Sequence, residues 1–238
     1  MPIAHEHTVK AFDEQLDRLT SMIARMGGMA EGQIAGAIQA VIKRDADLAA
    51  SVVETDQKVD LLEREIDEQA VALLALRQPM ASDLRTVVSA LRIAGDIERI
   101  ADYASNVAKR AIALSQMAPV RPVFQIPRMG TVVRDMLREV LDAYLTRNVD
   151  KAVAVWNRDE ELDEMYSSLF RELLTYMMED ARNITASTHL LFIAKNIERI
   201  GDHVTNVAET IHYLVVGRQL LGERPKGDFT SFVTRAQA

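Results

Sequence analysis

Residues 96–110 read DIERIADYASNVAKR, and residues 196–210, 100 positions later, read NIERIGDHVTNVAET. The two segments are identical at eight places, which include the charged pattern Glu-Arg-Ile-x-Asp as well as apolar residues. Both copies need a hydrophobic core, so retention of the apolar residues is expected from packing alone. Retention of the same charges needs a second reason. The chain is therefore an internal duplication, and its repeated charges indicate a function.

Apolar residues recur with a helical period in both segments. They are spaced alternately by four and three residues from Ile93 to Leu114, and again from Ile193 to Leu214. Such a seam, kept over three heptads, is typical of long helices that pack lengthwise at shallow angles. We therefore expect an all-α fold. The six long helices predicted from the pattern span residues 6–43, 47–77, 82–116, 128–146, 149–179 and 184–218.

The duplication covers more than these two segments. Asp56 and Asp60 recur as Asp159 and Asp163 at an offset of 103, which falls to 100 in the last helix of each half. Each half is expected to be an elongated three-helix bundle, since a helix of ~30 residues is ~45 Å long. The predicted division is 1–117 for the first bundle, 118–127 for a proline-rich linker, 128–220 for the second bundle and 221–238 for a loosely ordered C-terminal tail.

Composition excludes several classes of protein. The chain of 238 residues carries a net charge of −7 and has no Cys. An acidic chain is unsuited to sequence-independent binding of nucleic acid, and the lack of Cys excludes disulfides, thiolate metal sites and Cys nucleophiles. The first residues do not follow the pattern of a secretory signal peptide, and no apolar run approaches the ~20 residues that span a bilayer. We expect a cytoplasmic protein.

The repeated charges are expected on one face of each helix. With Ile97 as position a of the heptad, Glu98 is b and Asp102 is f, so the two carboxylates are predicted to be solvent-facing neighbours one turn apart. Glu198 and Asp202 occupy the same positions in the second copy. A second carboxylate pair, with i, i+4 spacing, stands on the preceding helix of each half. We hypothesise that the two pairs of each half converge into a cluster of oxygen ligands.

Such a cluster suits magnesium, manganese, calcium or iron better than a thiophilic metal. The candidate metal ligands are Glu98, Asp102, Asp56 and Asp60 in the first half, and Glu198, Asp202, Asp159, Asp163 and Glu209 in the second. Glu209 lies on the same predicted face as Glu198, whereas the first copy has Lys109 at that place. Because a positive charge repels a cation, the second half is predicted to bind metal more tightly than the first.

Three alternatives to a regulatory metal site stay open. Exposed charges of this kind are often only solubilising groups, since such pairs contribute ~0.3–0.5 kcal/mol. A metal-dependent helical-bundle enzyme needs an enclosed pocket, and a di-iron centre needs two Glu-x-x-His pairs where this chain has only Glu209-x-x-His212. The third alternative is a metal-free coiled-coil scaffold. Because the sequence contains no catalytic motif such as a Gly-x-Ser-x-Gly elbow, we predict that the protein is not an enzyme.

Residues 76–108, LRQPMASDLRTVVSALRIAGDIERIADYASNVA, resemble the first-repeat signature of the PhoU family of phosphate-uptake regulators. Residues 189–209, HLLFIAKNIERIGDHVTNVAE, are similar to its second-repeat signature. The resemblance implies two three-helix bundles and a cytoplasmic, non-enzymatic regulator that is expected to be a homodimer. It also implies negative regulation of the phosphate-starvation response, through contacts with the ATPase side of a phosphate ABC transporter and with a sensor histidine kinase.

The resemblance bears on the metal sites as well. Some family members carry metal ions on a Glu/Asp-x-x-x-Asp motif that matches the repeated motif here, and the possible ions are iron, manganese, magnesium or zinc. The first copy departs from the family pattern, because Ala101 stands where Gly is common, Tyr103 where His is common and Lys109 where an acid is common. These departures favour the second site. Contact with the membrane is expected only through the protein partners.

Overall fold

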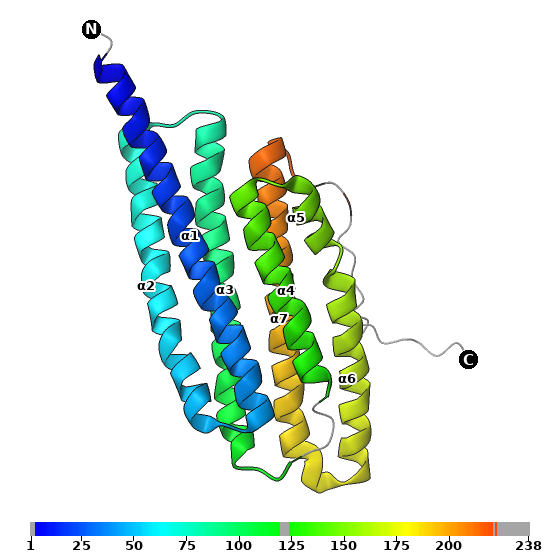
Figure 1. The fold of residues 1–238 in the computed structure, drawn as a ribbon. Helices are drawn as coiled ribbons and strands as arrows, with labels where there is room; N and C mark the ends of the chain where they lie inside the picture. The colour runs from blue at the N-terminus through cyan, green and yellow to red at the C-terminus, as the bar shows by residue number, and fades with distance from the viewer. Residues whose placement is uncertain (1–2, 120–123, 221, 223–238) are drawn as a thin grey trace.

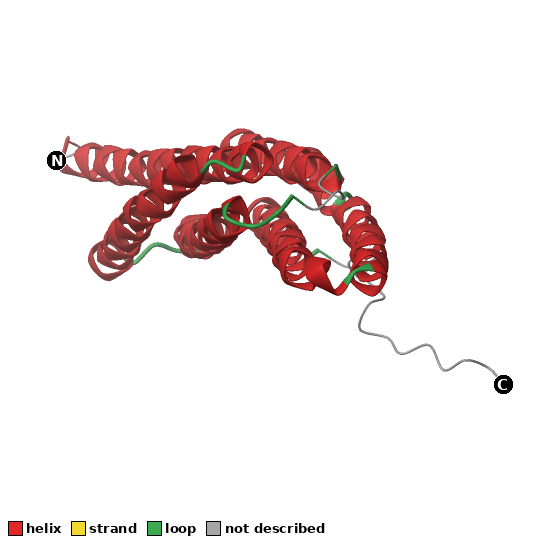
Figure 2. Ribbon diagram, turned by 90° about the horizontal axis from the view of Figure 1, so that it is seen from below, coloured by secondary structure: helices red, strands yellow, loops and turns green. Residues whose placement is uncertain are grey.

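The computed structural model describes residues 3–119, 124–220 and 222, with side chains from Phe12 onward. These residues form seven α-helices, one short 3-10 helix and no strand (Figure 2). The all-α fold class predicted from the apolar period is confirmed. The helices are α1 (Ile3–Lys43), α2 (Ala46–Arg77), α3 (Ser82–Ser115), α4 (Gln125–Thr146), α5 (Val149–Trp156), α6 (Asp159–Glu179), the 3-10 helix η1 (Ala181–Asn183) and α7 (Ile184–Val216).

The helices form two elongated bundles that lie side by side (Figure 1). The first bundle consists of α1, α2 and α3, and the second of α4, α5, α6 and α7. The central helices are α3 and α7. Helix α3 packs against α1 and α2, α7 packs against α4, α5 and α6, and the two central helices pack against each other. This arrangement confirms the predicted tandem of two similar helical bundles.

The apolar seams of α3 and α7 supply much of the core. Ile97 and Ile197, which open the repeated heptads, are fully buried. Burial extends beyond the seam, since Ala101 and Ser105 are also fully buried. A helix with neighbours on several sides is buried over more than its a and d positions. These helices are apolar on one side only, and none of the described helices has the length and the apolar character of a transmembrane span.

The bundles also meet through a symmetric pair of close contacts between α1 and α4. A β-carbon on Gly27 would lie 2.5 Å from Leu141 Cδ1, and a β-carbon on Gly130 would lie 2.6 Å from Ile38 Cγ1. Both residue pairs follow the offset of 103, so the duplicated residues make the same contact in reverse. Each glycine leaves room for a partner side chain that fills the space of a methyl group.

The structure divides the helix predicted over 149–179 into the short α5 and the long α6. The amide of Arg158 donates to the carbonyl of Val155 at 3.0 Å. This i→i+3 bond is tighter than an α-helical one and ends α5. Three acidic residues at 159–161 then occupy the first turn of α6, where the helix dipole favours negative charge. The described residues therefore form six long helices and the short helix α5, which the apolar period does not distinguish from α6.

The last residues of the predicted linker, 125–127, lie in a helix. Helix α4 begins at Gln125, so Pro127 lies in its first turn, where the N–H that proline lacks has no partner within the helix. Residues 120–123 of the predicted linker lie outside the described residues, as do residues 221 and 223–238 of the predicted tail. The division into domains at these points stays a prediction.

Replacing Gly27 by Ala is expected to destabilise the protein, although Ala favours a helix over Gly by ~1 kcal/mol. The new methyl group forces Leu141 to move, and overpacking of a core costs ~1–3 kcal/mol. Gly28→Ala is the matched control, because no atom lies within 4 Å of the place that its β-carbon would take. Urea denaturation of both variants measures the free energy of unfolding. Stabilisation of equal size in both variants would contradict the close contact.

Candidate functional site

In the first bundle, carboxylates of α2 and α3 influence one another. Burial raises the pKa of Asp56 on α2, and the negative charges of Asp60 and of Asp102 on α3 raise it further. Burial also raises the pKa of Glu98, where the adjacent Arg99 guanidinium acts in the opposite direction and Asp102 adds to the rise. The charges of the two predicted pairs of the first half therefore act on one another.

Glu63 belongs to the same group, although the repeated motif does not reveal it. Burial raises the pKa of Glu63, and the charges of Asp67 and Asp60 raise it further. Glu63 in turn raises the pKa of Glu98. Its position in the sequence could have indicated this, because Glu63 follows Asp60 by three residues and therefore lies on the same face of α2. We call the set of Asp56, Asp60, Glu63, Glu98 and Asp102 the first acidic cluster.

In the second bundle, Glu198 is buried rather than exposed to solvent. Its exposed fraction is 6%, whereas its counterpart Glu98 is half-buried. The expectation that this position faces solvent is wrong because α6 covers this side of α7. A β-carbon on Gly201 would lie only 2.4 Å from Leu162 Cδ2 on α6. The apolar seam shows where a core begins, but it does not show how far burial extends around a helix with several neighbours.

The carboxylate of Glu198 is held by Lys195. Lys195 Nζ donates to Glu198 Oε1 at 2.8 Å, while Oε2 is buried and has no hydrogen-bond partner in the described part of the chain. Burial raises the pKa of Glu198 to about 7, against the hydrogen bond from Lys195, and the charges of Asp202 and Asp163 contribute to the rise. Acids of both α6 and α7 thus act on Glu198, and an ammonium group lies beside it.

The acidic residues of α6 are more deeply buried than their counterparts on α2. Asp159 and Asp163 are exposed by only 2% and 4%, whereas Asp56 and Asp60 are half-buried. Asp159 Oδ1 would lie 3.8 Å from a β-carbon on Gly201, which places it against α7. We call the set of Asp159, Asp163, Glu198 and Asp202 the second acidic cluster. It is the more enclosed of the two.

The predicted order of metal affinity depends on Lys109 and Glu209, and both make other contacts. Lys109 Nζ lies 3.5 Å from Asn106 Oδ1, and Glu209 Oε1 accepts a hydrogen bond of 2.9 Å from the Trp156 indole. Neither is among the main charges that shift the pKa values of the clusters. The cation that distinguishes the clusters is Lys195, whose counterpart in the first half is a glycine, residue 95. Because the positive charge of Lys195 lies in the second half, electrostatic repulsion of a metal ion is expected to weaken the second site rather than the first.

The carboxylates do not form a ready-made coordination shell. Among the residues whose side chains the structure describes, no three His, Asp or Glu side chains are arranged to hold a metal ion. A cation at the first acidic cluster would draw half-buried carboxylates together and relieve their mutual repulsion. The donor set fits such an ion chemically, because carboxylate oxygens are the ligands that hard divalent cations prefer.

Between the bundles, duplicated positions of α3 and α7 face each other. The rings of Tyr103 and His203, which are counterparts, lie 5.6 Å apart. His203 Nδ1 lies 2.8 Å from Asp96 Oδ1, and the side-chain amide of Asn206 donates to the same oxygen at 3.3 Å. Residues early in α3 therefore meet residues late in α7, as expected for antiparallel helices. His203 joins the two bundles and does not belong to either acidic cluster.

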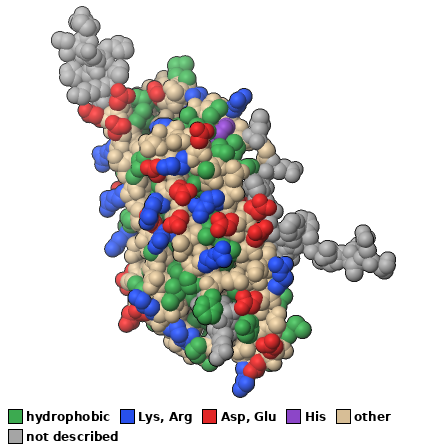
Figure 3. Space-filling view, turned by 45° about the vertical axis from the view of Figure 1, so that its right-hand side comes forward, with side chains coloured by type: hydrophobic (Ala, Val, Ile, Leu, Met, Phe, Trp, Pro, Cys, Tyr) green, Lys and Arg blue, Asp and Glu red, His purple; other side chains and the backbone are tan. Residues whose placement is uncertain are grey.

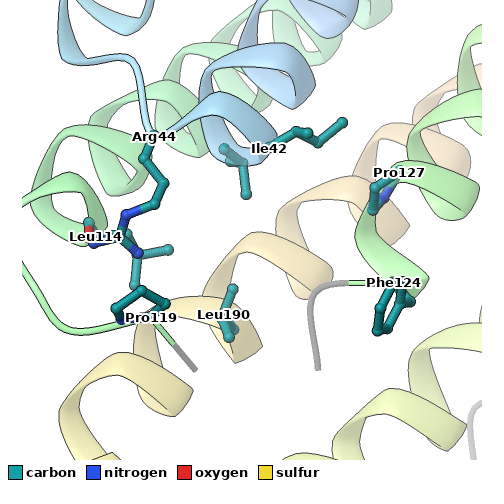
Figure 4. A pocket seen from close by; sticks show the side chains of 8 residues that line it. Ile42, Arg44, Leu114, Pro119, Phe124, Pro127 and Leu190 are labelled. Atoms are coloured by element: carbon teal, nitrogen blue, oxygen red, sulfur yellow. Dashed lines mark hydrogen bonds between the residues drawn. The ribbon is translucent and has the colours of Figure 1, made fainter. Parts of the chain in front are cut away.

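An apolar pocket of about 440 Å³ lies where the end of α1 meets the N-terminal parts of α4 and α7 (Figure 4). Leu114, Phe124 and Leu190 supply carbon surface to it. Arg44 also lines it, but its guanidinium donates to the carbonyl oxygens of Leu114 at 2.6 Å and of Ser115 at 3.3 Å, at the end of α3. The described residues of its lining include no carboxylate, imidazole or hydroxyl side chain, so they offer no acid–base pair.

Comparisons with known proteins match both halves to one family. The family model described as the PhoU domain matches residues 23–111 and again residues 126–211. Two relatives, each named phosphate-specific transport system accessory protein PhoU homolog, come from Caulobacter vibrioides (strain NA1000 / CB15N) and Rhizobium meliloti (strain 1021). They are 52% and 50% identical to this chain. The matches cover 95% and 96% of this chain, and 99% and 97% of those proteins.

A solved structure has the same fold. The crystal structure of PhoU from Pseudomonas aeruginosa matches with a TM-score of 0.84 at 41% identity, over 87% of this chain and 100% of that chain. The fold and its two acidic clusters define a duplicated, all-α protein with a group of carboxylates in each half. The chain belongs to the PhoU family. Its relatives are named accessory proteins rather than enzymes, in agreement with the prediction that this protein is not an enzyme.

Glu198 is expected to make the protein less stable as the pH rises. Its folded-state pKa of about 7 lies above the ordinary value of 4.5. The stabilising contribution of the protonated group is therefore complete below the unfolded-state pKa and is lost as the pH rises through about 7. Glu198→Gln should raise the free energy of unfolding at pH 8 by roughly 1–3 kcal/mol, because it removes a buried charge.

Urea denaturation at pH 5 and pH 8, with a chelator present, measures this effect. Glu98→Gln is the control at the duplicated position, and a smaller effect is expected there because Glu98 is half-buried. A Glu198→Gln variant that loses as much stability as the wild type between the two pH values would contradict the raised pKa.

Proposed function

We propose that this protein is an accessory regulator of phosphate-specific transport, and that it represses the phosphate-starvation response when phosphate is plentiful. The observation that carries the proposal is the 52% identity, over 95% of the chain, to a Caulobacter protein named for that transport system. The family domain is matched in both halves, so the similarity includes both bundles.

In this proposal the protein is a cytoplasmic adaptor between the ATPase subunit of a phosphate ABC transporter and a sensor histidine kinase. The long bundles offer extended surfaces for two partners (Figure 1). Charged side chains of both signs are interspersed over the middle of the face shown in Figure 3, and apolar side chains gather toward its lower end. Mixed charge of this kind favours specific and reversible contacts. A homodimer is part of the proposal.

We further propose that the first acidic cluster binds a divalent cation. Burial raises the pKa values of Asp56, Glu63 and Glu98, and neighbouring carboxylates add to each rise, so a cation would relieve repulsion among them. The cations that act on this cluster, Arg64 and Arg99, are exposed to solvent. In the second acidic cluster a buried carboxylate already has an ammonium partner. Oxygen-only donors favour magnesium, manganese or iron over zinc.

A metal-dependent enzyme is the less supported alternative. The acidic clusters lie on the sides of helices rather than in the lining of the apolar pocket, and the relatives are named accessory proteins. A metal-free scaffold is the other alternative. It differs from the proposal in one observable, because a scaffold keeps its regulation when the carboxylates of the first acidic cluster are replaced by amides.

Deletion of the gene is expected to leave phosphate-starvation genes active in phosphate-rich medium, because repression would lack its accessory regulator. A reporter of one such gene, measured in high phosphate, checks this. A plasmid copy of the wild-type chain should restore repression. Normal repression in the deletion strain, with no second gene of the family present, would overturn the proposed function.

The two acidic clusters are expected to differ in metal binding. Asp60→Asn with Glu98→Gln should weaken the binding of Mn²⁺ at least about tenfold, because each charged ligand contributes ~1.5–3 kcal/mol. Glu198→Gln with Asp202→Asn is the matched pair and should leave most binding intact, since Glu198 is already paired with Lys195. Calorimetric titration of both variants with Mn²⁺ decides. The opposite order of effects would support the tighter second site predicted from the sequence.

A further inference from the structure

A second pocket, of about 440 Å³, lies in the groove between α3 and α7 and is lined by cationic and amide side chains. Its lining residues are Asn106, Lys109, Arg110, His189, Phe192, Asn196 and Arg199. We infer that this pocket binds a phosphoryl group, carried either by inorganic phosphate or by a small phosphate ester. The site is distinct from both acidic clusters, and it does not depend on the proposed regulatory function.

The positive charges of this pocket are not neutralised by neighbouring acids. Lys109, Arg110 and Arg199 form no ion pair with a carboxylate in the described part of the chain. Among the described residues, Lys109 Nζ donates only to the amide oxygen of Asn106, at 3.5 Å. The groove is thus a local concentration of positive charge in a chain whose net charge is −7. An anionic ligand would supply the missing negative charge.

Arg110 is positioned by its neighbours rather than extended into solvent. Its guanidinium carbon lies 4.2 Å from the centre of the Phe192 ring, and Nη1 lies 3.3 Å from His189 Nδ1. A guanidinium group can only donate, so Nδ1 of His189 accepts this hydrogen bond. Burial, together with the charge of Arg110, lowers the pKa of His189. Stacking on a ring orders the guanidinium plane and leaves its other N–H groups available for an oxyanion.

The duplicated positions at the other end of the groove show that this charge is not a consequence of the fold. The counterparts of Lys109 and Asn196 are Glu209 and Asp96, and the counterpart of Arg110 is a threonine. That end carries Arg92 and Arg99 together with these two acids, so its formal charges cancel. The same backbone arrangement is therefore basic at one end and neutral at the other. Divergence from a common sequence has concentrated positive charge in one pocket.

The chemistry of the pocket favours phosphate over other anions. Two guanidinium groups and an ammonium group match the multiple charge and tetrahedral oxygens of a phosphoryl group, and guanidinium groups bind such oxygens in pairs. The amides of Asn106 and Asn196 are further hydrogen-bonding groups in the lining. A volume of about 440 Å³ also falls in the range of small-molecule sites, so a phosphate ester fits as well as the free ion.

Calorimetric titration of the full chain at low ionic strength tests this site, with inorganic phosphate and AMP as the two probes. At least one probe is expected to bind with a dissociation constant below about 1 mM. Arg110→Gln with Arg199→Gln should weaken that binding about tenfold or more, because charge-assisted hydrogen bonds are lost. Lys109→Gln, at an exposed position, provides a single substitution that spares the packing and should weaken binding in the same direction.

Arg92→Gln with Arg99→Gln is the matched control at the other end of the groove. It removes the same charge, and Arg92 also lies over a ring, that of Tyr213, at 5.6 Å. Binding by this control should stay within about twofold of the wild type, since only long-range charge changes. Tighter binding of phosphate would identify the free ion as the ligand class, and tighter binding of AMP would identify a phosphate ester.

Two results would overturn the anion site. One is the absence of binding by either probe. The other is equal weakening by the two double variants, which would show that only overall charge matters. Because these measurements use the purified chain alone, their failure would leave the proposed regulatory function intact. Failure of the regulatory function would leave the measured anion affinity unchanged.

Discussion

The antiparallel packing of α3 against α7 is the contact on which the rest of the structure depends. Each of these helices is the centre of its own bundle, and each carries one copy of the repeated heptads. Because they are copies, Tyr103 meets His203 within the interface, and equivalent residues lie toward opposite ends of the groove. The same packing leaves the outer side of each central helix to α2 or to α6. The acids of these outer helices therefore meet Glu98 in one half and Glu198 in the other.

A symmetric backbone here carries asymmetric charge. The residue that places an ammonium group in the second acidic cluster is Lys195, and the first half has only a glycine, residue 95, at that position. The burial of Asp159 and Asp163 adds to this difference, since their counterparts are half-buried. One cluster is thus open and rich in repulsion, and the other is enclosed and partly neutralised. Duplication supplied one scaffold, and single substitutions made its halves chemically different.

Much of the fold was predictable because it depends on a period that is visible in a single chain. The alternating spacing of four and three identified the central helices, and the offset between repeats identified the two bundles. The break between α5 and α6 was not visible, because a tight turn at Arg158 leaves the apolar pattern almost unchanged. Acids on neighbouring antiparallel helices raise the pKa values of Asp56 and Glu198, but no three described His, Asp or Glu side chains are arranged to hold a metal ion, so the predicted ligand cluster stays a prediction. Glu63 was not predicted, because the repeat does not include it.

The sequence by itself determined that the chain is helical, that it is duplicated and that its carboxylates gather on neighbouring helices, since these properties follow from residue type and spacing along one helix. Only the tertiary structure decided that Glu198 is buried, that Lys195 bonds to it and that Lys109 lines a basic groove. The physical reason is that a heptad specifies the angle at which a side chain leaves its helix. Which neighbouring helix covers that angle, and which charges the neighbour brings, depends on packing between segments far apart in the chain.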